Sequence, residues 1–188
     1  MTDTPPVAAA TLTHFYRLGM PRQFRLDLQE LERSYLSRSR EVHPDFHGLD
    51  TQARQRISLE QSAAINEAYH VLREPFLRAE YLLRLEGGPS ASKYKEMDPA
   101  FLEEMLELRM EIEELRDGGN PESPAMAEME RKLTQRRTKL IDDVACRFAQ
   151  AESQSATAVD RSAALLEIRK TVNAAKYIQG LLRDLHAD

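Results

Sequence analysis

The sequence predicts an all-α protein with two helical domains. Long segments repeat apolar residues every three or four positions, which is the spacing of one face of a helix. The 188 residues include seven glycines and no tryptophan, so there is little sign of sheets or of glycine-rich phosphate loops. Breaking residues gather at 87–90, where Gly-Gly-Pro-Ser predicts a domain boundary. We therefore expect a flexible tail over 1–12, an N-terminal domain over 13–87, a linker over 88–97 and a C-terminal domain over 98–188.

Composition argues against several classes of function. A formal charge of −5 argues against general nucleic-acid binding, which depends on phosphate neutralisation. No stretch approaches the roughly 18 apolar residues that a membrane span requires. The single cysteine, Cys146, permits no intramolecular disulfide, and we expect it to be a small buried side chain. The N-terminus lacks a basic segment, so no secretory or transit peptide is expected, and the predicted location is the cytoplasm.

The first long helix is expected to begin near Leu28 and to end near Val42. Asp27 and Glu30 form a capping-box pattern at its start. Pro44 disfavours the α conformation of the residue before it, which ends the helix. We expect a buried stripe on this helix formed by Leu28, Leu31, Tyr35 and Val42.

A loop from His43 to Asp50 separates this helix from a longer one. Pro75 kinks or restarts the longer helix, and Phe76 to Leu85 form one more helical stretch. We expect the inner face of the longer helix to consist of Ile57, Ala64, Ile65, Ala68, Tyr69 and Leu72.

The C-terminal domain is predicted to be an antiparallel three-helix bundle. Asp98 as N-cap and Pro99 at the first position begin a helix that reaches about Asp117. Ser123-Pro124 begins a second helix by the same logic, reaching about residue 151, and a third helix covers roughly 159–185. Long amphipathic helices with short connections favour a bundle. Its core is expected to include Leu133, Leu140, Val144, Phe148, Ile168, Val172, Ala175 and Leu182.

The first helix of this bundle has two apolar stripes. At about 100° per residue, Met105, Leu108, Ile112 and Leu115 fall within about 40° of Phe101 and form the core seam. A second stripe, Leu102, Leu106 and Met110, points away from that seam and has Glu103, Glu107 and Glu114 along one side. From 98 to 117 the net charge is −6. This pattern suits a partner that has a hydrophobic patch and a basic rim. The alternative is that the second stripe packs on the third helix or on the N-terminal domain.

The tripeptide His43, Pro44 and Asp45 stands between two predicted antiparallel helices. This arrangement resembles the J-domain, which has this tripeptide between its second and third helices, and residues 65–72 resemble that domain's third helix. Residues 72–83 resemble the segment after the J-domain in HscB-type co-chaperones of iron–sulfur cluster assembly. Residues 101–109 resemble the first helix of that family's bundle. The resemblance covers nearly all of the chain after residue 12.

The resemblance implies an L-shaped co-chaperone without its own catalysis or cofactor. Its J-domain would stimulate ATP hydrolysis by a heat-shock chaperone of the HscA or DnaK type. Its bundle would deliver an IscU-type scaffold, which carries the cluster, for the maturation of iron–sulfur proteins. Neither nucleic acid nor membrane is an implied partner.

The chaperone-binding residues implied are His43, Pro44, Asp45, Arg33 and Arg40. Asp45 suits a charge-assisted hydrogen bond to an arginine on the chaperone, and Pro44 reduces the entropy lost on docking. Arg33 and Arg40 fall about 130° from the Leu28 stripe and form a basic face next to the loop. The alternatives without a binding role are a turn in which Asp45 only caps the next helix, and an ordinary solvated helix face for the two arginines.

The implied scaffold-binding residues are Leu102, Leu106, Glu107, Met110 and Glu114. Three positions depart from the family pattern. Phe46 stands where a basic residue is usual, Glu103 where an apolar residue is frequent, and Met110 where an acid is common. An aromatic contact on the last helix has no clear match, because Asn173 is aligned with it and Tyr177 is the nearest aromatic residue.

Three further alternatives stay open. The first is a J-domain co-chaperone with a different client. The second is a metal-dependent enzyme that uses His43, Asp45, His47 and Asp50, although Pro44 and the lack of a second ligand cluster weaken it. The third is a purely structural helical adaptor. The sequence has no phosphate-binding loop and no serine elbow, so we expect no enzyme activity.

Overall fold

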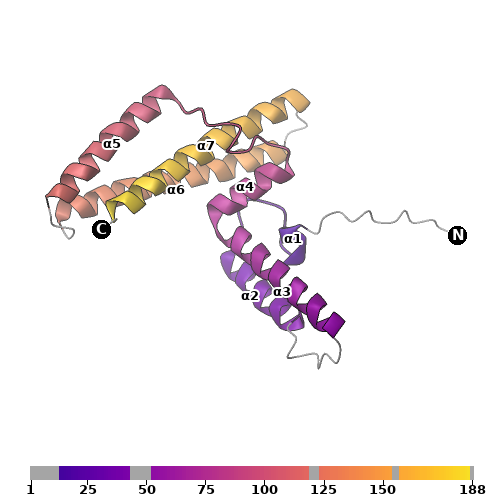
Figure 1. The fold of residues 1–188 in the computed structure, drawn as a ribbon. Coiled ribbons are helices and arrows are strands. Elements are labelled where there is room, and N and C mark those ends of the chain that lie inside the picture. The colour runs from indigo at the N-terminus through magenta and orange to yellow at the C-terminus, as the bar shows by residue number, and fades with distance from the viewer. Residues whose placement is uncertain (1–12, 43–51, 119–122, 154–156, 187–188) are drawn as a thin grey trace. The chain divides into compact units, whose positions relative to one another are not determined.

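The computed structural model describes residues 13–42, 52–118, 123–153 and 157–186, and every regular element within these ranges is a helix (Figure 1). The chain divides into two compact units, 1–78 and 79–188. The all-α prediction is confirmed. The predicted L shape concerns the arrangement of the two units and stays a prediction. The helices are α1 (His14–Arg17), α2 (Leu28–Val42), α3 (Gln52–Arg73), α4 (Pro75–Leu85), α5 (Pro99–Asp117), α6 (Pro124–Ser153) and α7 (Ala158–Leu185).

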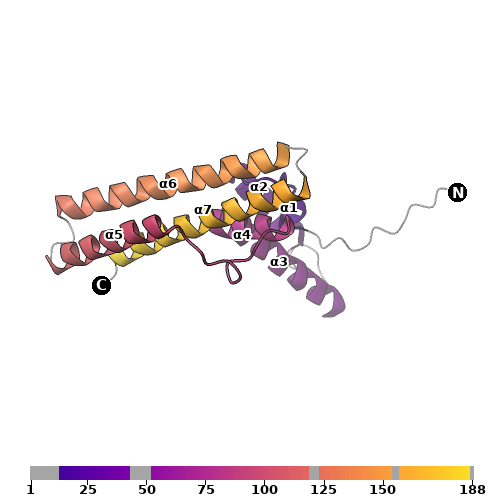
Figure 2. The ribbon, with the colours of Figure 1, turned by 90° about the horizontal axis from the view of Figure 1, so that it is seen from above.

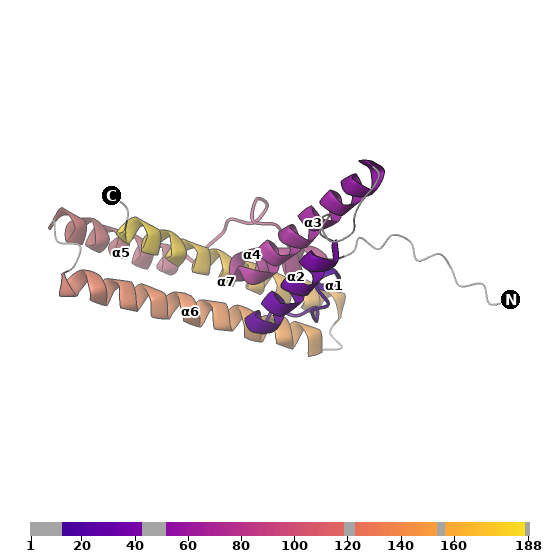
Figure 3. The ribbon, with the colours of Figure 1, turned by 90° about the horizontal axis from the view of Figure 1, so that it is seen from below.

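In the first unit, α2 and α3 lie side by side as a helical hairpin (Figures 1 and 3). A carboxylate oxygen of Asp27 accepts hydrogen bonds from the backbone N–H groups of Gln29 and Glu30 at 2.8 and 3.2 Å, so α2 begins where predicted. The rings of Tyr35 and Tyr69 stack with centroids 4.1 Å apart. The buried apolar residues of the two helices are Leu31, Ile65, Ala68 and Leu72. The short α1 was not predicted, and it buries Phe15 against this hairpin.

Two of the residues predicted to be buried in the hairpin are exposed. The prediction for Leu28 is wrong, since its side chain is 50% exposed at the first position of α2, and Phe24 is the buried residue before it. The prediction for Ile57 is also wrong, because it is 54% exposed. Its neighbour Ser58 is buried and donates a hydrogen bond to the carbonyl of Val42. A small polar residue therefore occupies the contact face at this end of α3.

The buried guanidinium of Arg78 closes the C-terminal end of α3. It donates hydrogen bonds to the carbonyl oxygens of Leu72 at 2.7 Å, Phe24 at 2.6 Å and Arg73 at 3.2 Å. The last carbonyls of a helix have no partner within the helix, so this side chain satisfies groups that would otherwise be left unpaired. Burial lowers the pKa of Arg78, and the nearby carboxylate of Glu74 acts in the opposite direction.

The second unit contains the predicted antiparallel three-helix bundle (Figure 2). Asp98 accepts a hydrogen bond from the N–H of Ala100 at 2.8 Å and caps α5, as predicted. Thr157 and Asp160 form a capping box at the start of α7. Helices α6 and α7 lie together along their length, whereas α5 joins them mainly through its central and C-terminal part. The buried cluster there contains Met105, Leu108, Ile112, Met126, Met129, Leu133, Ile178, Leu181, Leu182 and Leu185.

The division between the units falls inside α4, earlier than the predicted boundary at 88. Gly87, with a φ of 76°, does end α4, so the breaking residues mark a turn. Residues from Ala79 onward nevertheless belong to the second unit, because Glu80 forms ion pairs with Arg169 and Lys176 of α7. Such a long-range contact has no local signal in the sequence.

The prediction that Cys146 is buried is wrong. Its side chain is exposed, while Val144, Ala145 and Phe148 are buried. Two positions along a helix turn by about 200°, which places Cys146 on the side opposite to Val144.

Candidate functional site

The first candidate surface lies on α2. Arg33 and Arg40 are both exposed, and Leu36 between them in the chain is 46% exposed. The carbonyl of Val42, at the end of the helix, accepts a hydrogen bond from Ser58. This bond fixes the point at which the chain leaves α2, directly before the predicted docking loop. Arg33, Leu36 and Arg40 follow one another at helical spacing, so the two cations and the apolar side chain lie on the same side of α2.

The remaining residues of the predicted docking site, His43, Pro44 and Asp45, lie outside the described residues. The alternative metal site also includes His47 and Asp50, which lie outside them too. Among the residues that the structure describes, no group of three or more metal-ligating side chains comes together.

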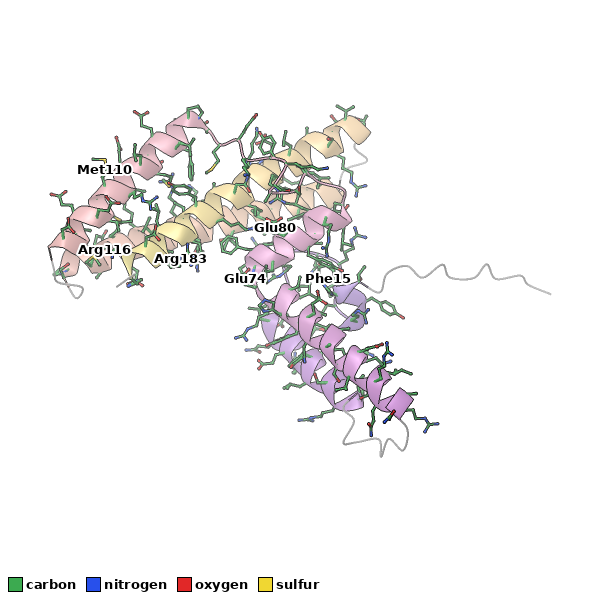
Figure 4. The ribbon with its side chains drawn as sticks, in the orientation of Figure 1. Phe15, Glu74, Glu80, Met110, Arg116 and Arg183 are labelled. Atoms are coloured by element: carbon green, nitrogen blue, oxygen red, sulfur yellow. The ribbon has the colours of Figure 1, made fainter. Side chains whose placement is uncertain are left out.

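The second candidate surface is the stripe Leu102, Leu106 and Met110 on α5. Their side chains are 44%, 59% and 62% exposed. Met110 lies on the side of α5 that faces away from α7 (Figure 4). On the opposite side of the same helix, Met105 and Ile112 are 0% and 1% exposed. The alternative in which this stripe packs on the third helix is therefore wrong.

The acidic groups of α5 differ in what they contact. Glu104 forms a two-pronged ion pair with Arg136 of α6, and the hydrogen bonds from Arg136 hold the pKa of Glu104 below its ordinary value. Glu107 and Glu114 are exposed and have no hydrogen-bond or ion-pair partner within the described ranges. Glu104 thus fixes α5 to α6, whereas the two unpaired carboxylates remain available to a partner next to the stripe.

The two candidates for an aromatic contact on α7 have roles within the bundle. The amide of Asn173 donates a hydrogen bond to the carbonyl of Tyr94 at 3.1 Å. The ring of Tyr177 meets that of Phe101 edge to face, with centroids 6.2 Å apart. The guanidinium of Arg136 lies 5.4 Å from the Phe101 centroid. Tyr177 therefore supports α5 from the core side. These contacts join residues far apart in the chain, so the sequence pattern did not predict them.

Comparisons with known proteins show which family the chain resembles. Residues 97–186 match the family described as the HSCB C-terminal oligomerisation domain. The chain is 35% identical over 133 residues to a co-chaperone protein HscB homolog from Bordetella petrii, covering 70% of this chain and 76% of the relative.

Two solved structures have the same fold. The chaperone HscB from Vibrio cholerae superposes with a TM-score of 0.75 and 28% identity over 92% of this chain and 94% of that one. The human co-chaperone protein HscB gives a TM-score of 0.73 and 26% identity over 94% of this chain and 81% of that one. In the part of the chain that the structure describes, no helix is long and apolar enough to cross a membrane. The relatives are co-chaperones, and the chain belongs to the HscB family of co-chaperones.

Proposed function

We propose that this co-chaperone stimulates ATP hydrolysis by a heat-shock chaperone of the HscA or DnaK type and delivers to it an IscU-type scaffold for iron–sulfur cluster transfer. The observation that carries the proposal is the exposed stripe Leu102, Leu106 and Met110 in a chain that belongs to the HscB family. A contiguous apolar patch on a protein surface, especially one rimmed by polar residues, marks a site of interaction with a partner.

The chaperone-binding half of the proposal assigns roles to His43, Pro44, Asp45, Arg33 and Arg40. Arg33 and Arg40 are exposed on α2 and suit an acidic patch on the ATPase, where complementary charge raises the rate of association. Asp45 would accept a charge-assisted hydrogen bond from an arginine of the chaperone.

The scaffold-binding half assigns Leu102, Leu106 and Met110 as apolar anchors and Glu107 and Glu114 as the acidic rim. Apolar anchors at the centre of an interface supply most of its binding energy, and rim charges supply orientation. Because Glu107 and Glu114 have no partner in the described part of the chain, they can pair with basic residues of the scaffold. We therefore expect a scaffold surface with an apolar patch and a basic border.

In this proposal the protein performs no catalysis and binds no cofactor, and the cluster is cargo on the scaffold. We also place the protein in the cytoplasm, a reducing compartment that agrees with a chain containing a single, exposed cysteine.

The test is ATP hydrolysis by the cognate chaperone, measured with this protein, with and without the scaffold, and repeated with Asp45→Asn. Stimulation that rises synergistically with the scaffold and disappears in Asp45→Asn supports both halves. Stimulation without synergy retains the J-domain function and favours a different client, a second candidate supported by the exposed Glu103 and Met110 that depart from the family pattern. No stimulation, from folded protein and active chaperone, contradicts the proposal.

A further inference from the structure

A pocket of about 500 Å³ lies at the N-terminal end of α5, inside the second unit. Helices α5 and α7 diverge toward this end (Figure 1), and the segment before α5 contributes Glu96 and Met97 to the lining of the pocket. Leu140 of α6 and Ala174 of α7 contribute apolar surface, and Tyr94 and Phe101 line it from the segment before α5 and from α5. Phe101, which lines the pocket, directly precedes Leu102, the first residue of the proposed scaffold-binding stripe, in the chain.

Side-chain hydrogen bonds hold this pocket in shape. The amide of Asn173 binds the carbonyl of Tyr94 at 3.1 Å, and the guanidinium of Arg169 binds the carbonyl of Pro89 at 2.8 Å. Both bonds attach the segment before α5 to α7. Asp98 then fixes the first turn of α5, and the edge of Tyr177 supports Phe101. The walls are thus preformed, so an occupant does not have to order them first.

Some charged side chains that line the pocket have an ion-pair partner, and others have none among the described residues. Lys170 is bound by Glu167 at 2.7 Å, and that hydrogen bond raises the pKa of the lysine, with smaller contributions from Tyr94 and Glu96. Asp143, in contrast, has no hydrogen-bond or ion-pair partner among the described residues, and no ion pair joins it to Arg147 one turn later. Lys170 is therefore already paired with Glu167. Asp143 and Glu96, which also lines the pocket, are the carboxylates without a hydrogen-bond or ion-pair partner among the described residues, and Asp143 is on α6 with the apolar wall residue Leu140.

We propose that this pocket is a second recognition site for the scaffold and that it receives a lysine or arginine side chain from a projecting loop of that partner. This inference rests on the proposed function and extends it. The methylene stem of such a side chain would pack against Leu140 and Ala174, and its charged head would bind the carboxylate of Asp143. The acidic rim of α5, Glu107 and Glu114, is proposed to bind basic residues of the same partner. One basic surface of the scaffold would then contact both the stripe and the pocket.

The experiment measures binding of the purified scaffold to the full-length chain by calorimetry, with three variants. Asp143→Asn removes the acceptor and keeps the shape. Ala174→Phe fills the pocket and keeps the charge. Asp142→Asn is the matched control, since it removes one charge from the neighbouring position, which does not line the pocket. Thermal melting of each variant establishes that it is folded.

We expect Asp143→Asn to weaken binding about tenfold, as the loss of a charge-assisted hydrogen bond does, and to make binding less dependent on salt. Ala174→Phe should weaken binding at least as much, and Asp142→Asn should leave it within about twofold. If folded Asp143→Asn and Ala174→Phe bind like the unmodified protein while Leu102→Ala with Leu106→Ala loses affinity, the pocket inference is wrong and the proposed function stands. If the unmodified protein does not bind the scaffold at all, the proposed function itself fails.

Discussion

Arg169 and Glu80, 89 residues apart in the chain, form a two-pronged ion pair in which both N–H···O distances are 2.6 Å. The side chain of Arg169 is 1% exposed, and that of Glu80 is 26% exposed. Lys176 donates a further hydrogen bond to Glu80 at 2.7 Å. Glu80 lies on α4 on the side that meets α7 (Figure 4). This ion pair attaches the second half of α4 to the bundle and explains why the division of the chain falls before Glu80.

Replacing Glu80 with glutamine should destabilise the second unit. The substitution leaves the buried guanidinium of Arg169 without a counter-charge, which is costly in a medium of low polarity. We expect the free energy of unfolding to fall by about 2–3 kcal/mol at pH 7, at or below the lower end of the usual cost because Glu80 is partly exposed. Urea unfolding monitored by circular dichroism checks this. Glu128→Gln, which breaks an exposed pair with Arg131, is the control and should change little.

The same pair predicts a pH dependence. Burial acts to raise the pKa of Glu80, but the hydrogen bonds from Arg169 and Lys176 outweigh it, so the pKa lies below its ordinary value of 4.5. A carboxyl whose pKa is lowered by folding stabilises the protein above the ordinary pKa and loses that contribution as the pH falls through the folded value. The stability difference between the unmodified protein and Glu80→Gln should therefore shrink below pH 4.5. A difference that stays constant down to pH 2.5 or so would contradict this account.

The three hydrogen bonds that the guanidinium of Arg78 donates should not be reproduced by another cation. Lysine keeps the charge, but its compact ammonium cannot reach the carbonyls of Leu72, Phe24 and Arg73 in one plane as the guanidinium does. We expect Arg78→Lys to lower the free energy of unfolding by about 2 kcal/mol, measured by urea denaturation. Arg40→Lys on exposed α2 is the matched substitution and should have no measurable effect on stability.

The basic face of α2 should set how much co-chaperone is needed for half-maximal ATPase stimulation. Arg33→Ala with Arg40→Ala removes two exposed cations that stabilise nothing else in the described structure. We expect the half-maximal concentration to rise several-fold at low salt, with a smaller difference at high salt, where exposed charges are screened. The maximal rate should change less. Arg38→Ala, on another side of the same helix, is the control, and an equal effect of that variant would mean that only net charge matters.

Substitutions in the α5 stripe should weaken scaffold binding and leave the stability of the protein unchanged. Leu102→Ala with Leu106→Ala should weaken scaffold binding by about 1–3 kcal/mol without lowering the melting temperature, because both side chains are exposed. Met105→Ala, on the buried side of the same helix, should cost about 2–5 kcal/mol of stability. A large loss of stability in the double variant would show that these leucines belong to the core.

Helix bounds were predictable because capping residues act locally, as Asp27 and Asp98 do. Burial was less predictable where a polar residue holds a contact position. Ser58 packs against the end of α2, so the apolar pattern pointed to Ile57 instead. The outward stripe on α5 was visible in the sequence, since it is a matter of helix geometry.

Contacts between distant segments were not predictable in the same way. The ion pair of Glu80 with Arg169 determines the division of the chain, and the bond from Asn173 to Tyr94 shapes the pocket beside α5. Each contact depends on tertiary packing, because its two residues are about 80 to 90 positions apart in the chain and share no local sequence pattern.

The negative charge of α5 also bears on how two copies of the chain behave in solution. Exposed leucines on a helix would ordinarily favour pairing of that helix with its own copy, but two such helices, each with a net charge of −6 when the N-cap Asp98 is included, repel one another. The acids thus preserve colloidal stability while the stripe is uncovered. This protection depends on ionic strength, because at about 1 M salt the repulsion extends only about 3 Å. The stripe can therefore stay apolar enough to bind a basic partner, while charge repulsion opposes the association of two copies through it.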